Sequence, residues 1–256
     1  MTTTPIFNGV GVALVTIFDS TGAVDAGATA ELASRLVELG VKSVLVAGSN
    51  GEAASLEPDE RALLVGAVRA ALPPQVVVLA GSGAASARQA ARLTRVVLDA
   101  GADGVLALSP PQSSDARDYY ELVAEAAGPA SVLAYHFPSV SPPGLPVGVL
   151  GELPVAGIKD SSGDIRRLYD ELEGFPGWLY TGSANLVLLA GALECAGAIL
   201  GIANLEPELA VRAFEGDGTA QRQLVAAADA VSGHWPHGLK QRVAARFGTS
   251  AVVRMG

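Results

Sequence analysis

Residue types that carry metal, redox or disulfide chemistry are scarce in this 256-residue chain. Cys195 is the single cysteine, which excludes an internal disulfide and predicts a core-filling role in a reducing compartment. The three histidines, His136, His234 and His237, lack the spacing of a three-ligand site, so we predict that no metal is bound. Aromatic residues make up 5% of the chain, and lysine occurs three times against fourteen arginines.

Basic residues are also outnumbered by acidic ones, 17 to 26. The formal net charge is −9 and the pI is near 4.8, whereas nucleic acids and anionic membranes require a basic surface, so we expect neither partner. The first five residues have neither the basic nor the apolar region of a secretory signal, which predicts a cytoplasmic protein. The most apolar stretch, residues 186–203, is interrupted by Glu194 and by glycines, and we expect a buried helix and a buried strand there.

Hydrophobic residues, by contrast, are plentiful and recur in short runs. They make up half of the chain, which is enough for a large core. Eight runs have the continuous apolar character of strands that are buried on both faces: residues 9–18, 41–48, 76–83, 104–109, 131–137, 155–161, 178–182 and 196–204.

Stretches of helical character separate these runs, among them residues 26–39, 58–72, 86–100 and 115–127. Eight such units predict an α/β fold, a closed (β/α)8 TIM barrel rather than an open doubly wound sheet. No linker interrupts the pattern, so we expect residues 1–256 to form a single barrel domain. Additional C-terminal helices are expected, with residues 217–256 as a short helical extension; the segments are 206–216, 219–232 and 238–247.

Lys159 closes one of the apolar runs, at the barrel end where loops build the active site. A lysine in an apolar interior loses part of its proton affinity and can form a Schiff base with a ketone, which arginine cannot. Gly157 shares its face and is expected to leave room for the lysine stem. The alternative interpretation is an ion pair with Asp160 or another acid at the rim. The contexts of Lys42 and Lys240 are ordinary.

Tyr135 ends the run before the one that carries the lysine, and a phenol there can relay a proton. The alternative is a core tyrosine whose hydroxyl is bonded to the backbone. His136 has the opposite parity and is expected to pack outward beneath the helices. Ser49 and Asn50 lie in a Gly-rich loop with free N–H groups that suits a carboxylate, although Ser-Asn-Gly is also common turn chemistry.

These residues together indicate a class of chemistry. A 2-oxo acid would be held by its carboxylate, its ketone would condense with Lys159, and Tyr135 would move protons while a carbon-carbon bond is broken or formed. This chemistry needs no cofactor besides the covalent lysine imine itself.

Over nearly its whole length the chain resembles the dihydrodipicolinate synthase / N-acetylneuraminate lyase family of pyruvate-dependent class I aldolases. The motifs that carry the resemblance occur in family order at residues 48–52 (Gly-Ser-Asn-Gly-Glu), 79–83 (Leu-Ala-Gly-Ser-Gly), 135 with 138–139, 157–161 (Gly-Ile-Lys-Asp-Ser), 182–183 and 197–204. Within the family, the first two motifs look most like those of the 4-hydroxy-2-oxoglutarate aldolases.

The resemblance implies a (β/α)8 barrel in which Lys159 is the Schiff-base lysine and Tyr135 the proton relay. It further implies that Ser49 and Asn50 hold the pyruvyl carboxylate, with Ser161 nearby and the backbone of Gly201 and Ala203 beside the imine. The expected partner is a 2-oxo acid such as pyruvate, and the expected assembly is a homo-oligomer, either a dimer or a tetramer.

Two departures from the family pattern leave alternatives open. The synthases carry an arginine after the tyrosine motif that binds the second substrate's carboxylate, and here Val140 or Ser141 occupies that region, which makes synthase activity less expected. Where many members carry a Tyr-Tyr pair, this chain has Pro111 and Gln112. The second hypothesis is therefore a non-catalytic or repurposed barrel that binds a 2-oxo acid as a sensor or scaffold, and a third is a phosphate-binding isomerase that uses Gly182 and Ser183.

Overall fold

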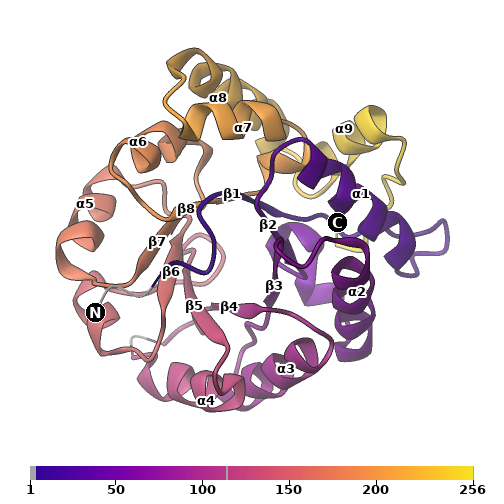
Figure 1. Cartoon of the computed structure of the whole chain (residues 1–256). Coiled ribbons are helices and arrows are strands. Elements are labelled where there is room, and N and C mark those ends of the chain that lie inside the picture. The colour runs from indigo at the N-terminus through magenta and orange to yellow at the C-terminus, as the bar shows by residue number, and fades with distance from the viewer. Residues whose placement is uncertain (1–3, 114, 256) are drawn as a thin grey trace.

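The computed structural model describes residues 4–113 and 115–255, and in these ranges eight parallel strands close into a barrel in the order β1 to β8 (Figure 1). Residues 1–3 lie outside the described residues. The prediction that the first five residues form no secretory signal therefore falls partly outside them. The strands are β1 (Gly9–Ala13), β2 (Ser43–Val46), β3 (Val77–Gly81), β4 (Gly104–Leu108), β5 (Ser131–His136), β6 (Gly157–Asp160), β7 (Trp178–Thr181) and β8 (Gly197–Leu200). The predicted (β/α)8 barrel is confirmed.

Helices surround the strands, as Figure 1 shows. They are α1 (Ala26–Glu38), α2 (Pro58–Ala71), α3 (Ala87–Asp99), α4 (Arg117–Ala127), α5 (Ile165–Gly174), α6 (Val187–Ala192), α7 (Pro207–Phe214), α8 (Gly218–Ser232) and α9 (His237–Phe247). The connection from β5 to β6 carries a short 3-10 helix, Val147–Glu152, where the other strand connections carry an α-helix. Segment 206–216 is not an additional helix as expected: α7 directly follows β8 and is the last helix of the barrel.

Local sequence explains where these helices begin and end. Asp25 and Ser86 accept a hydrogen bond from the first turns of α1 and α3, and Glu57 forms a capping box at α2. Gly40 and Gly101 follow α1 and α3 with φ of 105° and 104°, the left-handed conformation that a glycine adopts without strain. Helix ends are therefore set by the residues that the sequence places there.

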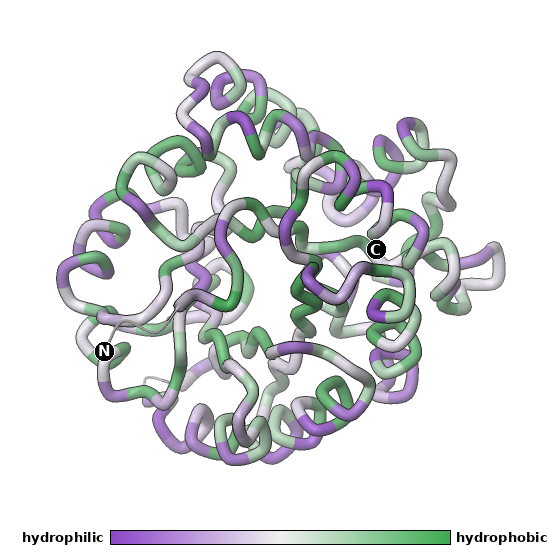
Figure 2. Tube along the Cα trace, viewed as in Figure 1, coloured by the Kyte–Doolittle hydropathy of each residue, from purple (hydrophilic) through white to green (hydrophobic). Residues whose placement is uncertain are grey.

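Two apolar layers hold the barrel together. The larger lies between the strands and the helices, and Figure 2 shows the hydrophilic segments mostly on the outer helices and loops. The smaller layer fills the barrel interior. Along each strand, inward-facing side chains of this layer alternate with outward-facing side chains of the larger layer; the inward-facing ones include Ala13, Leu45, Leu79, Leu106, Leu133, Tyr135, Tyr180 and Ile199. Phe7 stacks on Tyr180, and the phenol of Tyr180 donates to the carbonyl of Phe7 at 2.8 Å. Phe7, which precedes β1, thus packs into the barrel interior from the amino ends of the strands.

Candidate active site

Lys159 lies at the carboxyl end of β6 and is 3% exposed. Its register partners on the neighbouring strands are Tyr135 and Tyr180, both of which belong to the barrel interior. The ammonium nitrogen lies 4.1 Å from the centroid of the Tyr135 ring. Within the described residues Lys159 takes part in no ion pair, because Asp160 accepts from Ser162 and pairs with Arg167 instead. The rim ion pair with Asp160 is therefore wrong, and the amine lies against a phenol in the barrel.

The space for the lysine stem comes from a glycine other than the expected one. A Cβ on Gly157 would meet the carbonyl and Cβ of Trp178, so this residue permits close contact between β6 and β7. A Cβ on Gly182 would lie 2.8 Å from Cε of Lys159 and would also collide with the hydroxyl of Ser161. Gly182 follows β7. Absence of a side chain there, and not at Gly157, leaves room for the amine and the serine.

Tyr135 and Ser161 meet beside this amine. The hydroxyl of Ser161 donates to the phenol oxygen of Tyr135 at 3.4 Å, which is a long and weak hydrogen bond. The ring of Tyr135 stacks on Phe137, with 5.7 Å between the centroids. The phenol thus bonds a side chain of the site and not the backbone, in contrast to the core-tyrosine alternative. Lys159, Tyr135 and Ser161 form one cluster that spans β5, β6 and the start of the next loop.

The predicted carboxylate loop forms a 3-10 turn, Ser49–Gly51, directly after β2. Thr16 donates to the carbonyl of Gly51 at 2.7 Å and ties this turn to the end of β1. Asn50 reaches the end of β8, since a Cβ on Gly201 would lie 2.6 Å from its amide nitrogen. Among the described residues, no protein group hydrogen-bonds the side chains of Ser49 and Asn50. Both remain available to a ligand.

Asn204 holds the residues beside this loop. It is fully buried, its amide donates to the carbonyls of Ala13 and Gly201 at 2.7 and 2.8 Å, and its oxygen accepts from Val15 at 3.0 Å. These bonds join β1 to the 3-10 turn Ile202–Asn204 after β8. The backbone of Gly201 and Ala203 is therefore fixed at the mouth. Sequence reasoning treated Asn204 only as the end of a motif, although a buried amide after a strand could have indicated this role.

A buried ion pair lies under the same loop, and the sequence analysis missed it. Lys240 of α9 is 1% exposed and its ammonium lies 2.6 Å from the carboxylate of Glu52, which is fully buried. Lys240 also donates to the carbonyl of Val252 at 2.7 Å. Burial lowers the pKa of Lys240, and the hydrogen bond to Glu52 opposes that shift. The ordinary context assigned to Lys240 is thus wrong, because its partner lies far away in the sequence.

Glu52 also binds the C-terminal segment, residues 249–255. Its second oxygen accepts from the backbone N–H groups of Arg254 and Met255 at 2.7 and 2.8 Å. The guanidinium of Arg254 forms two hydrogen bonds with Glu60 of α2, at 2.8 and 2.6 Å, and lies over the ring of Phe18. Bonding to Arg254 lowers the pKa of Glu60. These bonds place the C-terminal segment against α2, as can be followed in Figure 1.

A second charged cluster lies on the outer side of β5 and β6. His136 is buried and accepts a hydrogen bond from the N–H of Leu145, which confirms its outward direction. Arg167 lies between two carboxylates, 3.4 Å from Asp160 and 2.8 Å from Glu171. Burial, with the charge of Asp160, raises the pKa of Glu171 to about 8, while burial and Arg167 lower the pKa of His136 to about 4.

These two shifts have opposite consequences for stability. The folded protein holds a proton on Glu171 that the unfolded chain has released above pH 4.5, so this contribution to stability is lost as the pH rises toward about 8. For His136 the unfolded chain binds the proton first, so stability is lost as the pH falls from 6.5 to about 4. Above pH 6.5 only the loss from Glu171 remains.

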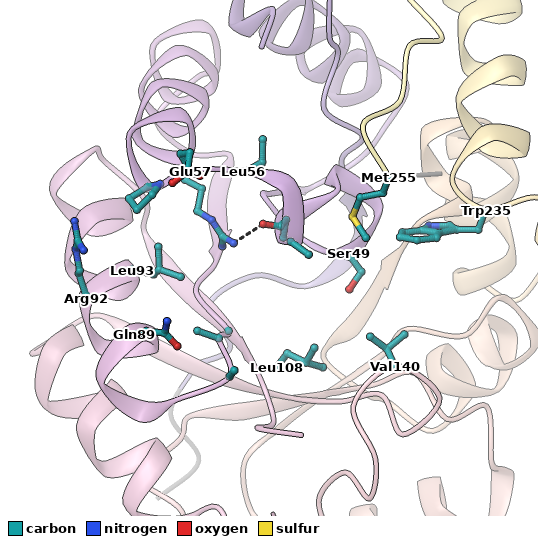
Figure 3. Close-up of a pocket in the computed structure, with 17 residues that line it drawn as sticks. Ser49, Leu56, Glu57, Gln89, Arg92, Leu93, Leu108, Val140, Trp235 and Met255 are labelled. Atoms are coloured by element: carbon teal, nitrogen blue, oxygen red, sulfur yellow. Dashed lines mark hydrogen bonds between the residues drawn. The ribbon is translucent and has the colours of Figure 1, made fainter. Parts of the chain in front are cut away.

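Two cavities that share lining residues lie beside Tyr135, and neither is lined by Lys159 or Ser161. The deeper has a volume of about 50 Å³ and is lined by Ser49, Leu108 and Tyr135 among others. A water molecule needs a cavity of about 10–15 Å³, so the deep cavity accommodates a ligand of a few heavy atoms. The outer cavity has a volume of about 550 Å³ and shares Ser49, Gly83 and Leu108 with it. Figure 3 shows Ser49, Met255, Trp235, Val140 and Leu108 at one end of this opening and Arg92, Gln89 and Glu57 toward the other.

The remaining predictions concern groups away from this cavity. Cys195 is buried, and burial raises the pKa of its thiol to about 11, as befits a core residue. The described residues contain no cluster of three metal-ligating His, Cys, Asp or Glu side chains. No helix in the described part of the chain has the length and hydropathy needed to cross a membrane.

Comparison with known proteins agrees with this geometry. Residues 6–234 match the model of the dihydrodipicolinate synthetase family. An uncharacterised DapA-like lyase of Halobacterium salinarum is 35% identical over 217 residues, which cover 81% of this chain and 71% of that protein. A 4-hydroxy-tetrahydrodipicolinate synthase of Salinibacter ruber is 33% identical over 215 residues, or 79% of this chain and 70% of that protein.

Solved structures of similar proteins have the same fold. The prophage protein YagE of E. coli K12, of the dihydrodipicolinic acid synthase family and solved in complex with pyruvate, gives a TM-score of 0.90 at 23% identity, over 97% of this chain and 92% of that one. The dihydrodipicolinate synthase of Aquifex aeolicus gives a TM-score of 0.87 at 23% identity, over 97% and 91% of the two chains. At these identities the similarity shows a shared fold alone.

Proposed function

The chain belongs to the dihydrodipicolinate synthetase family and is a carbon-carbon lyase of the class I aldolase type, and from this we propose that it cleaves or forms a 4-hydroxy-2-oxo acid through an imine on Lys159. The observation that carries the proposal is the buried amine of Lys159, free of any carboxylate among the described residues and 4.1 Å from the Tyr135 ring centroid. A buried lysine amine that is paired with no carboxylate can act as a nucleophile toward a ketone.

Ser49 and Asn50 would hold the carboxylate of the 2-oxo acid, because their side chains have no protein partner in the described structure; Ser49 lines the deeper cavity, and Asn50 lies against Gly201 at the end of β8. The amine of Lys159 then attacks the C2 carbonyl, and loss of water leaves the imine. Removal of the proton from the C4 hydroxyl breaks the bond between C3 and C4. Its electron pair enters the enamine, and an aldehyde leaves.

Tyr135 is proposed as the group that moves protons in these steps. Its phenol is bonded to Ser161, so the two hydroxyls form a short relay beside the amine. Protonation of the enamine at C3 and hydrolysis of the imine would release pyruvate and regenerate Lys159. The reverse sequence would form the 4-hydroxy-2-oxo acid from pyruvate and an aldehyde.

A homo-oligomeric assembly is also proposed, and sedimentation would measure it.

Borohydride trapping tests the proposal. Incubation with pyruvate and borohydride should add one reduced pyruvyl group to Lys159, as identified by peptide mass spectrometry, and inactivate the protein irreversibly. Lys42→Ala, a change at an exposed lysine, is the matched control and should still be labelled. If Lys159 stays unmodified with pyruvate and several other 2-oxo acids, the proposed imine is refuted.

The non-catalytic barrel is the second candidate, and the residues Pro111 and Gln112 favour it, because they stand where many members carry the Tyr-Tyr pair. A sensor would be stabilised thermally by pyruvate and would release no product from a 4-hydroxy-2-oxo acid. The synthase reaction named by the relatives is disfavoured. Val140 presents an apolar side chain to the opening, and Ser141 is buried and donates to the carbonyl of Ser109 at 2.6 Å.

A further inference from the structure

The half of the outer cavity nearest Ser49 is walled by apolar side chains. Leu108, Val140, Trp235 and Met255 surround the opening there, as Figure 3 shows. Val140 and Trp235 are 53% and 47% exposed, although large apolar side chains usually lie inside. Single exposed apolar residues need no explanation, but these two come from distant segments and line the same opening. The wall is therefore a built apolar surface at the entrance to the cavity that reaches Tyr135.

Of the charged residues that line this opening, Glu57 and Arg61 are hydrogen-bonded within the fold and Arg92 lies at the far end, while Arg61 pairs with no carboxylate among the described residues and its Nε has no hydrogen-bond partner. Arg61 donates to the carbonyls of Gly81 and Ala53 at 2.9 and 2.6 Å. Glu57 caps α2. Arg92 lines the end of the cavity opposite Met255 and Trp235 (Figure 3). A carboxylate placed against the apolar wall would lose water, and the wall's own four side chains, Leu108, Val140, Trp235 and Met255, offer it no cation, which is unfavourable.

The position of Met255 in this wall is set by the network beneath it. Its N–H donates to Glu52, and Glu52 in turn pairs with Lys240. A flexible thioether on a fixed backbone adapts to apolar ligands of different shape. In this wall the backbone of Met255 is held in place and its side chain is flexible. Such a surface suits a ligand group that is recognised by its apolar contact area and not by hydrogen bonds.

We propose that this wall binds the aldehyde half of the substrate and selects an apolar group, aliphatic or aromatic, over one that bears a carboxylate. The inference rests on the proposed function, because the aldehyde must extend outward from an imine on Lys159. The wall adjoins Ser49 and Leu108, which line both cavities, so a ligand whose carboxylate lies on the loop extends directly onto it. The substrate is then a 4-hydroxy-2-oxo acid with an apolar substituent at C4.

Condensation kinetics with pyruvate test this specificity. The value of kcat/KM for straight-chain aldehydes from acetaldehyde to hexanal should rise about fourfold for each methylene that becomes buried. Benzaldehyde should exceed glyoxylate and succinic semialdehyde by at least about tenfold, the discrimination that a small difference in apolar contact produces. Val140→Arg should reverse this preference toward glyoxylate by about tenfold or more. Leu122→Arg, at an exposed leucine of α4 outside the cavity lining, should leave the ratio unchanged.

The outcomes separate this inference from the function on which it rests. If borohydride traps pyruvate on Lys159 but glyoxylate is the better aldehyde, the apolar subsite is refuted and the aldolase stands. If no imine forms, the aldolase function and the apolar subsite are both refuted. If Trp235→Ser changes the sedimentation coefficient and leaves the aldehyde preference intact, the wall is a contact between copies of the chain, which also refutes the inference.

Discussion

Lys240→Met should be strongly destabilising, although this lysine lies far from Lys159 in the sequence. The substitution removes the ammonium that lies 2.6 Å from Glu52 and leaves a carboxylate that is 0% exposed. Two backbone N–H groups still bond its other oxygen, but no cation replaces Lys240 within the pair. Removal of one partner from a buried ion pair costs about 3–5 kcal/mol. We expect a loss of that size in the free energy of unfolding.

Urea unfolding followed by circular dichroism measures this loss, with a check that the slope m is unchanged. Lys42→Met is the matched control, because Lys42 is exposed and its replacement should change stability by less than about 0.5 kcal/mol. In the double variant Lys240→Met with Glu52→Gln, the buried charge is gone, so the loss should be smaller than in Lys240→Met alone. Glutamine retains an oxygen for the N–H groups of Arg254 and Met255.

Lys240→Met should also affect binding, since Glu52 ends the loop that holds Ser49 and Asn50. Lys240→Met should raise the pyruvate concentration needed for half-maximal imine trapping, while Lys42→Met should not. A loss of less than about 1 kcal/mol in Lys240→Met would refute the reasoning, because the pair would then contribute no more than an exposed one. A double variant less stable than Lys240→Met would refute it as well.

Three further predictions concern other parts of the molecule. Tyr135→Phe should lower kcat by about 10²–10⁴ while imine trapping persists, and a near-normal turnover rate would exclude proton transfer by the phenol. Gly182→Ala should displace Ser161 and the stem of Lys159, so that imine formation slows at least about tenfold with the fold intact by circular dichroism; unchanged trapping would show that the side chains move aside. Stability should fall between pH 6.5 and 8 by at most about 1.4 kcal/mol per pH unit as Glu171 loses its proton, and a Glu171→Gln variant with the same slope would contradict this assignment.

The sequence predicted the barrel and the location of the lysine because both follow from local patterns. Continuous apolar runs indicate strands buried on both faces, and parallel strands bring their carboxyl ends to one mouth. The convergence of Lys159 with Tyr135 was expected from the order of the strands, and the register pairs these two residues directly. The outward direction of His136 followed from strand parity in the same way.

The features that escaped prediction depend on contacts between distant segments. Nothing near Lys240 in the sequence indicates its pairing with Glu52, because an ion pair between segments that are distant in the sequence leaves no local periodicity. The wrong glycine was assigned to the lysine stem for a similar reason. Gly157 shares the strand of Lys159, whereas Gly182 reaches it from the neighbouring strand, and strand parity carries no information about that contact.

The connection between Glu52 and the C-terminal segment also bears on how the chain folds. Glu52, which follows the turn Ser49–Gly51, accepts hydrogen bonds from Arg254 and Met255, and the end of β1 is joined to Asn204. Contacts between such distant parts of the chain require closure of long loops and form slowly. A partly folded chain could therefore have most of its strands paired before the cavity exists. Appearance of pyruvate-trapping capacity during refolding should lag behind secondary structure, so catalytic competence would be a late event in folding.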